Sequence, residues 1–106
     1  MLEHIVVVDA GDLPRPPLEA ALDRFAHGIR GCRGLISISW GQNFNPLGLE
    51  RRCHYVCTVI LESEETLRTH YWEHPAHQIL LAELPGLCES RFALDYFIDE
   101  DAAHAR

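Results

Sequence analysis

The chain has 106 residues, of which 47% are hydrophobic and 24% are charged, a composition typical of one ordinary globular domain. Its formal net charge of −7 argues against binding to nucleic acid or to anionic membranes, because both need a basic surface. All 9 basic residues are arginine, so a Schiff base on a lysine amine and a nucleotide-binding P-loop are both excluded.

The first part of the chain predicts a strand followed by a helix. Residues 2–8 are mostly apolar and favour a strand. Because this strand begins without a basic segment or a cleavage site, we expect no secretory signal and a cytoplasmic location. Pro16 and Pro17 suit the first turn of a helix, and the apolar residues after them recur at helical spacing up to a turn over residues 31–34.

Two strands separated by a loop are predicted next. Residues 35–40 alternate between apolar and small polar side chains, which is the period of a strand. Residues 41–49 are expected to form a loop, and residues 52–62 are rich in β-branched and aromatic side chains and predict a long strand. The apolar residues expected to share one face of the first of these strands are Ile36, Ile38 and Trp40.

The last part of the chain predicts an interrupted helix and a final strand. Ser63 can cap a helix, and the acidic residues after it lie at the positive end of the helix dipole, so the helix should run to about Glu73. Pro75 is disfavoured inside a helix, so we expect a break there and a second helical segment that ends near Leu84. Residues 90–98 then form the last strand.

This β-α-β-β-α-β order predicts an α+β ferredoxin-like domain over residues 1–98, followed by a polar tail over residues 99–106. Its sheet would be antiparallel and four-stranded, with both helices on one face. The first, third and fourth strands are apolar on both faces; in the first, Ile5 and Val7 alternate with equally apolar neighbours. The uncovered face would be a large apolar patch, so we expect a homodimer that packs the open sheet faces together.

Histidine and cysteine give only weak indications of a metal site. His70, His74 and His77 have spacings of metal ligands on one helix face, but Pro75 interrupts that face. The cysteines match no zinc-binding pattern and are expected to be buried and reduced. They are Cys32, Cys53, Cys57 and Cys88.

Tyr71 and His77 flank the predicted helix break and are candidates for acid–base chemistry. A neutral imidazole is an effective general base at neutral pH, and a nearby phenol can orient a substrate or donate a proton. A kink between them would bring both side chains toward the cleft between helix and sheet. The alternative is a structural role, in which Tyr71 packs in the core while His74 and His77 brace the break.

His4 lies on the same face as Val6 and Val8 in an otherwise apolar strand, so it needs a hydrogen-bond partner or faces a cavity. Tyr55 is expected to pack within its strand. No nucleophile elbow, glycine-rich phosphate loop or dinucleotide fingerprint is present, so we expect no nucleotide, flavin or metal cofactor.

Residues 71–77, Tyr-Trp-Glu-His-Pro-Ala-His, resemble the Y-x-x-H-P-A-H signature of the stress-responsive A/B barrel (Dabb) domain family. Three shorter features agree with that family: residues 4–8 at the start, residues 40–41 at the end of the second strand, and residues 95–96 in the last strand. The resemblance covers residues 3–98, nearly the whole chain.

The resemblance implies a dimeric α/β barrel built from ferredoxin-like chains. Many family members have no assigned activity and are linked to stress responses. Others, such as the plant cyclase that makes olivetolic acid, close a linear polyketide by intramolecular aldol condensation without a cofactor. Matched by motif, the general base of that branch falls on His77, the assisting tyrosine on Tyr71, and a pocket-lining histidine on His4.

The chain also departs from the plant cyclase. It has one extra residue between Ser63 and Tyr71, and Tyr55 stands where that cyclase has a further pocket histidine. The end of the first strand is acidic, with Asp9 and Asp12, where relatives are often basic. These differences leave the substrate open. The candidates for substrate binding are His4, Tyr55 and His74.

Together, these features predict a cofactor-independent cyclase or lyase that closes a poly-β-carbonyl substrate, with His77 as general base and Tyr71 holding the oxygen that becomes anionic. The alternative is a non-catalytic dimer that binds a small apolar ligand or acts in a stress response. A third hypothesis, a cofactor-free monooxygenase, has no specific sign in the sequence.

Overall fold

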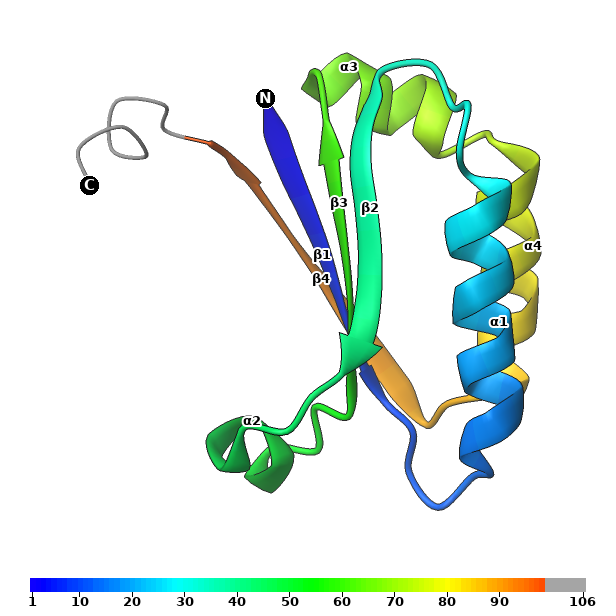
Figure 1. Ribbon diagram of the computed structural model, residues 1–106, viewed down its shortest axis with the longest axis vertical. Coiled ribbons are helices and arrows are strands. Elements are labelled where there is room, and N and C mark those ends of the chain that lie inside the picture. The colour runs from blue at the N-terminus through cyan, green and yellow to red at the C-terminus, as the bar shows by residue number, and fades with distance from the viewer. Residues whose placement is uncertain (99–106) are drawn as a thin grey trace.

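The computed structural model describes residues 1–98, and these form one sheet with its two long helices on one side (Figure 1). The expected polar tail, residues 99–106, lies outside the described residues. The elements in chain order are β1 (Leu2–Asp9), α1 (Arg15–Gly28), β2 (Leu35–Gln42), α2 (Pro46–Glu50), β3 (Tyr55–Leu61), α3 (Glu64–Thr66), the π-helix η1 (Leu67–Tyr71), α4 (Pro75–Glu83), the 3₁₀ turn η2 (Leu84–Gly86) and β4 (Ser90–Phe97).

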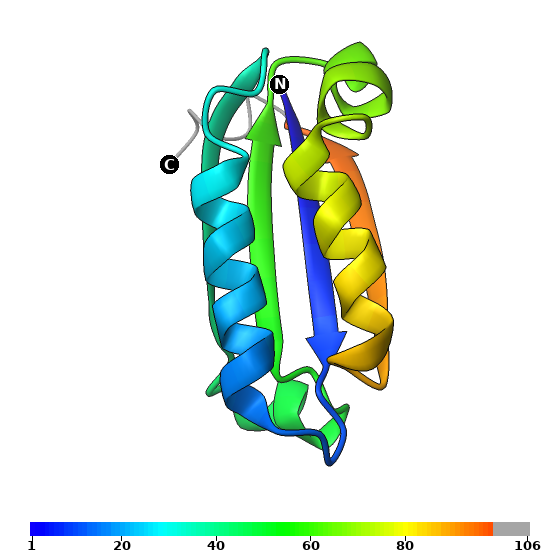
Figure 2. The same cartoon turned by 90° about the vertical axis from the view of Figure 1, so that its right-hand side faces the viewer.

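The four strands are arranged in the order β2-β3-β1-β4, and every neighbouring pair is antiparallel. β1 is therefore central, with Ile5 opposite Thr58 of β3 and Leu94 of β4. α1 and α4 lie side by side over a single face of this sheet (Figure 2). The predicted ferredoxin-like α+β fold is confirmed, and none of the helices described is long and apolar enough to cross a membrane.

The core lies between the inner face of the sheet and the two long helices. Alternate residues of β3, from Tyr55 to Leu61, are buried on this face, as the period of a strand requires. α1 supplies the opposite side of the core through Leu18, Leu22 and Phe25, which recur along one helix face. Burial of each such side chain contributes about 1.5–3 kcal/mol to folding.

The outer face of the sheet is apolar and uncovered, as predicted from the two-sided strands. Phe92 and Leu94 of β4 are each 53% exposed. They lie opposite Val7 and Ile5 of β1, which are only partly buried. No helix of the described chain covers this face (Figure 1).

The structure corrects the predicted alternation of β2. Leu35 lies opposite Leu61 and Ser37 lies opposite Ile60, so the register shifts by one residue at Ile36. A bulge of this kind moves one residue out of the alternation, because two residues on one strand face a single residue on the other. Ile36 is therefore exposed, whereas Ile38 and Trp40 pack against the core as expected.

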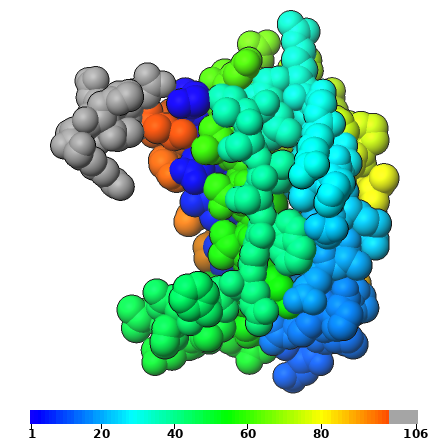
Figure 3. All heavy atoms as spheres, viewed as in Figure 1, coloured from blue at the N-terminus to red at the C-terminus, as the bar shows by residue number. Residues whose placement is uncertain are grey.

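A short helix replaces part of the loop predicted over residues 41–49. Asn45 caps α2 by accepting a hydrogen bond from Leu47 N at 3.0 Å, and Pro46 occupies the first helical turn. The segment around α2 projects from the side of the sheet that faces away from α1 and α4 (Figure 3). It exposes apolar side chains, above all Phe44.

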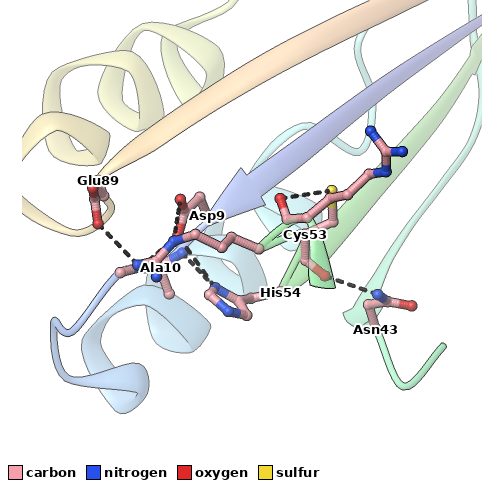
Figure 4. Close-up of polar contacts among 9 residues, drawn as sticks. Asp9, Ala10, Asn43, Cys53, His54 and Glu89 are labelled. Atoms are coloured by element: carbon pink, nitrogen blue, oxygen red, sulfur yellow. Dashed lines mark hydrogen bonds and ion pairs between the residues drawn. The ribbon is translucent and has the colours of Figure 1, made fainter. Parts of the chain in front are cut away.

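Polar contacts connect the ends of the strands at the end of the sheet next to α2 (Figure 4). Arg52 donates to Asp9 Oδ2 and to Glu89 Oε2, both at 3.1 Å. Ala10 N donates to His54 Nδ1 at 3.0 Å, so His54 is a partly buried structural residue. β3 begins at Tyr55, later than the predicted residue 52.

Two neighbouring residues of α4 differ in exposure, so substituting them tests which face of this helix packs in the core. Leu80 is 8% exposed and packs in the core, whereas Ile79 is 58% exposed. Because Leu80→Ala leaves a cavity, we expect it to lower the free energy of unfolding by about 2–5 kcal/mol. Ile79→Ala deletes as many carbon atoms and should change that free energy by about 0.5 kcal/mol or less. Urea unfolding measures both, and equal losses would contradict this assignment of the helix face.

Candidate active site

The helix that leads to the candidate site widens before it ends. Ser63 Oγ accepts a hydrogen bond from Thr66 N at 3.2 Å and caps α3, as predicted. From Leu67 onward the expected α-helix is replaced by η1, in which Trp72 N donates to Leu67 O at 3.1 Å across five residues. Such π-helical turns occur frequently at functional sites.

The predicted break at Pro75 is confirmed. His74 has an extended backbone, and its Nδ1 accepts a hydrogen bond from Ala76 N at 3.1 Å, which caps α4. Pro75 occupies the first position of α4, where its missing N–H costs nothing. The structure thus places His74 in a cap, and it is not among the residues that line the cavity described below.

His77 lies in the first turns of α4 and is 5% exposed. Its Nδ1 lies 3.0 Å from Trp72 O, a carbonyl that can only accept, so Nδ1 carries the proton and donates. The other ring nitrogen, Nε2, is then unprotonated in the neutral ring. Burial lowers the pKa of His77, the hydrogen bond to Trp72 opposes this only in part, and the charge of Arg91 acts in the same direction as burial, so His77 is a neutral base near neutral pH.

Tyr71, the last residue of η1, is 2% exposed and packs against His77, with their ring centroids 4.7 Å apart. On its other side the His4 ring lies 5.3 Å away in an edge-on arrangement. Burial raises the pKa of Tyr71, and the carboxylate of Asp95 contributes in the same direction. The phenol therefore remains protonated and available as a hydrogen-bond donor.

His4 faces inward from β1, as the sequence predicted, and it has the polar partner that a buried histidine requires. His4 Nδ1 donates to Asp95 Oδ1 at 2.5 Å. The contact arises because β1 and β4 are antiparallel and His4 is directly opposite Asp95 in their register. Asp95 was not among the candidate site residues. It belongs to one of the short features that resemble the family, but its contact with His4 depends on a strand pairing that the sequence does not display.

His4, Tyr71 and His77 line one cavity of about 510 Å³, which opens between η1, α4 and the inner face of β4. This volume is within the usual range of small-molecule sites. A much smaller inner cavity of about 40 Å³ lies deeper between helices and sheet and shares Tyr71 and His77. The other residues that line the large cavity are Leu67, Arg68, Trp72, Ala93 and Asp95.

Tyr55 lies away from this group. It is the first residue of β3 and is opposite Val8, whereas His4 is opposite Val59 further along the strand. Its hydroxyl donates to Glu19 Oε2 at 2.7 Å, and the guanidinium of Arg15 lies over its ring. The structure therefore gives Tyr55 a packing and bracing role and does not bring it into the cavity with His77.

The three histidines of the possible metal face are dispersed. His74 caps α4, His77 lines the cavity, and His70 lies in a separate surface hollow. Over residues 1–98 no group of three or more histidine, cysteine or acidic side chains could hold a metal ion. The four cysteines are free, and burial raises the pKa of Cys57 to about 12, so its thiol is inert.

A model of the stress-responsive A/B barrel domain family matches residues 2–98, almost the entire chain. The protein belongs to this family. No curated protein matches the sequence. Solved structures with the same fold include an Arabidopsis thaliana protein, which is 17% identical with a TM-score of 0.78 and covers 93% of this chain and 96% of its own.

Two other solved structures have the same fold as this A/B barrel domain. A dimeric ferredoxin-like protein of unknown function from Thermobifida fusca is 18% identical, with a TM-score of 0.77, over 92% of this chain and 90% of its own. A hydroxynitrile lyase from Passiflora edulis is 16% identical, with a TM-score of 0.76, over 93% of this chain and 94% of its own. At these identities the likeness shows the fold alone.

The lowered pKa of His77 makes the stability of this A/B barrel domain depend on pH. Because the folded pKa lies below the ordinary value of 6.5, the unfolded chain takes up a proton first as the pH falls. We therefore expect the free energy of unfolding to decrease as the pH drops through 6.5, and His77→Gln to lose that part of the dependence.

Urea unfolding at about pH 7.5 and about pH 5.5 measures the effect. The matched control is His27→Gln, since His27 is exposed on α1 and should leave the difference between the two pH values unchanged. The same pH dependence in His77→Gln and in the unaltered protein would contradict a depressed pKa at His77.

Proposed function

We propose that this protein is a cofactor-independent acid–base enzyme, a cyclase or lyase that acts on a poly-β-carbonyl substrate. One observation carries the proposal: a cavity of about 510 Å³ brings the neutral base His77, the phenol of Tyr71 and the His4–Asp95 pair to a single surface. A carbonyl compound held there meets a proton acceptor and a proton donor at once.

The chemistry follows from the protonation states. His77 Nε2 removes a proton from the carbon between two carbonyl groups, and the electron pair left behind forms an enolate. The enolate carbon then attacks a second carbonyl carbon of the same molecule, and the resulting alkoxide takes the proton from the His77 imidazolium. Tyr71 stabilises the anionic oxygen by donating its hydroxyl hydrogen bond, because burial keeps it protonated.

The His4–Asp95 pair would support the same reaction by holding the His4 ring in a fixed orientation at the cavity. The bond from His4 Nδ1 to Asp95 fixes the ring and leaves His4 Nε2 as the nitrogen available to a ligand. Phe25 and Trp72 pack beside His77, with ring centroids 6.3 and 5.0 Å from it, and give the site aromatic walls. Such walls exclude water and favour the folded conformation that an intramolecular reaction needs.

A second candidate is a non-catalytic protein that binds a small apolar ligand. It is favoured by the filled interior, since the inner cavity of about 40 Å³ admits little beyond a water molecule. Two features support the enzyme instead: the large cavity reaches the candidate residues, and Nε2 of His77 is not used by the internal bond to Trp72. The fold is shared with a hydroxynitrile lyase, which supports lyase chemistry only by analogy.

The proposed assembly is a homodimer through the outer face of the sheet. Phe92 and Leu94 would be covered by the same residues of a second copy, which removes apolar surface that water disfavours. Structural neighbours from Thermobifida fusca, Bacteroides fragilis and Jannaschia are described as dimeric, which supports this assembly for a chain of the same fold.

The catalytic roles predict different losses for two substitutions. His77→Ala removes the base and should lower kcat by about 10²–10⁴-fold. Tyr71→Phe keeps the ring but loses the donor, and should lower kcat by about 10²–10³-fold. The measurement is cyclisation of a linear tetraketide thioester, followed by mass spectrometry of the product.

His27→Ala is the matched control, because this exposed histidine of α1 should keep the full rate. A full rate in His77→Ala would end the assignment of the base. No turnover by the unaltered protein, with the tetraketide still bound, would favour the non-catalytic binding protein.

The proposed dimer can be tested on the outer face of the sheet. Leu94→Asp places a charge where a second sheet would pack, so we expect the dimer to dissociate. Ile79→Asp puts the same charge on the exposed side of α4 and should leave the dimer intact. Analytical ultracentrifugation distinguishes the two states, and a Leu94→Asp protein that stayed dimeric would refute this interface.

A further inference from the structure

β4 carries one positively charged side chain into the region of the candidate site. Its inward-facing residues are those opposite the inward residues of β1: Arg91 lies opposite Val8, Ala93 opposite Val6, and Asp95 opposite His4. Ala93 and Asp95 line the large cavity, and Arg91 precedes them on the same face of the strand.

Arg91 also lines the small inner cavity, together with Tyr71 and His77. It is the only arginine, lysine or acidic residue there among the described residues; the remaining walls are apolar apart from those two aromatic groups and the thiol of Cys57. The positive charge of Arg91 is close enough to His77 to lower its pKa. A cation therefore lies beside the proposed base, at the edge of a largely apolar chamber.

This cation has no protein counter-ion in the described chain. Over residues 1–98 no carboxylate lies within ion-pair distance of Arg91, although the protein is acidic, with a net charge of −7. The two nearest acids on this strand and at its start are engaged elsewhere. Asp95 is bonded to His4 at 2.5 Å, and Glu89 to Arg52 at 3.1 Å.

We propose that Arg91 binds a carboxylate on the ligand of this site, and so selects acids over their neutral analogues. The proposal rests on the proposed function and deepens it, because it assigns a carboxylate to the carbonyl substrate. A guanidinium presents a planar fork of donors that matches a carboxylate with two parallel hydrogen bonds. Arg91 is itself exposed, so the carboxylate of a ligand can reach its guanidinium.

The position of Arg91 also orients the ligand. With its carboxylate on Arg91, outside the small inner cavity, a molecule that follows the inner face of β4 past Ala93 reaches the large cavity, which His77 and Tyr71 line. Arg91 is in this sense a specificity residue, distinct from the groups that transfer protons.

Binding of a matched pair of small probes tests the proposal without turnover. Phenylacetate and phenylacetamide share an aromatic ring and differ in charge, and titration calorimetry with the full chain gives a Kd for each. We expect phenylacetate to bind at least about tenfold more tightly. Arg91→Leu should abolish that preference, and so should Arg91→Gln, which keeps a polar side chain but removes the charge.

Arg24→Leu is the matched control. Arg24 lies on α1 outside both cavities of the site, is exposed and is paired with Glu83 at 2.6 Å, so its loss should leave the preference for the acid unchanged. Far-ultraviolet circular dichroism of each variant checks that the fold is kept.

Three results would overturn the proposal: equal binding of the two probes, no binding of phenylacetate at millimolar concentration, or loss of the preference in Arg24→Leu but not in Arg91→Leu. These results do not depend on catalysis. A full cyclisation rate in His77→Ala, with the preference for the acid intact, would refute the enzyme mechanism and leave the carboxylate site standing.

Discussion

β1 pairs with β3 along one edge and with β4 along the other, and both the core and the candidate site depend on this central position. The pairing fixes which residues of β1 face the helices, and so places His4 on the inner face of the sheet with Val6 and Val8. It also sets His4 opposite Asp95, on a strand that is nearly a whole chain length away in sequence. A shift of register by one residue would turn His4 to the opposite face and separate it from Asp95.

Desolvation shifts the pKa values of the two candidate residues, His77 and Tyr71, in opposite directions. The same burial disfavours the imidazolium of His77 and the phenolate of Tyr71, so one pKa is lowered and the other is raised. Both side chains are then neutral over the same pH range, one as an acceptor and one as a donor. A single, largely apolar environment thereby favours two complementary roles.

The sequence predicted the features that depend on local pattern. Two-sided apolar strands indicated the open outer face, the HPAH block indicated the helix break, and the period of β1 put His4 on the inner face. Features that depend on contacts between distant residues were missed. The contact of His4 with Asp95 arises from strand pairing, and so does the bulge at Ile36. The hydrogen bond from Ala10 to His54 joins two segments that are far apart in sequence.

The wide turn of η1 allows the number of residues in this helix to vary. In an α-helix, one added residue rotates everything after it by about 100° and would swing Tyr71 away from His77. A π-helical turn absorbs the added residue locally, and the phase of the following residues is preserved. The extra residue that the resemblance to the plant cyclase implies between Ser63 and Tyr71 would fall in this stretch, because η1 spans Leu67–Tyr71. A π-helical turn can thus accommodate an insertion inside a helix beside the Tyr71–His77 pair, in the way that surface loops accommodate insertions elsewhere.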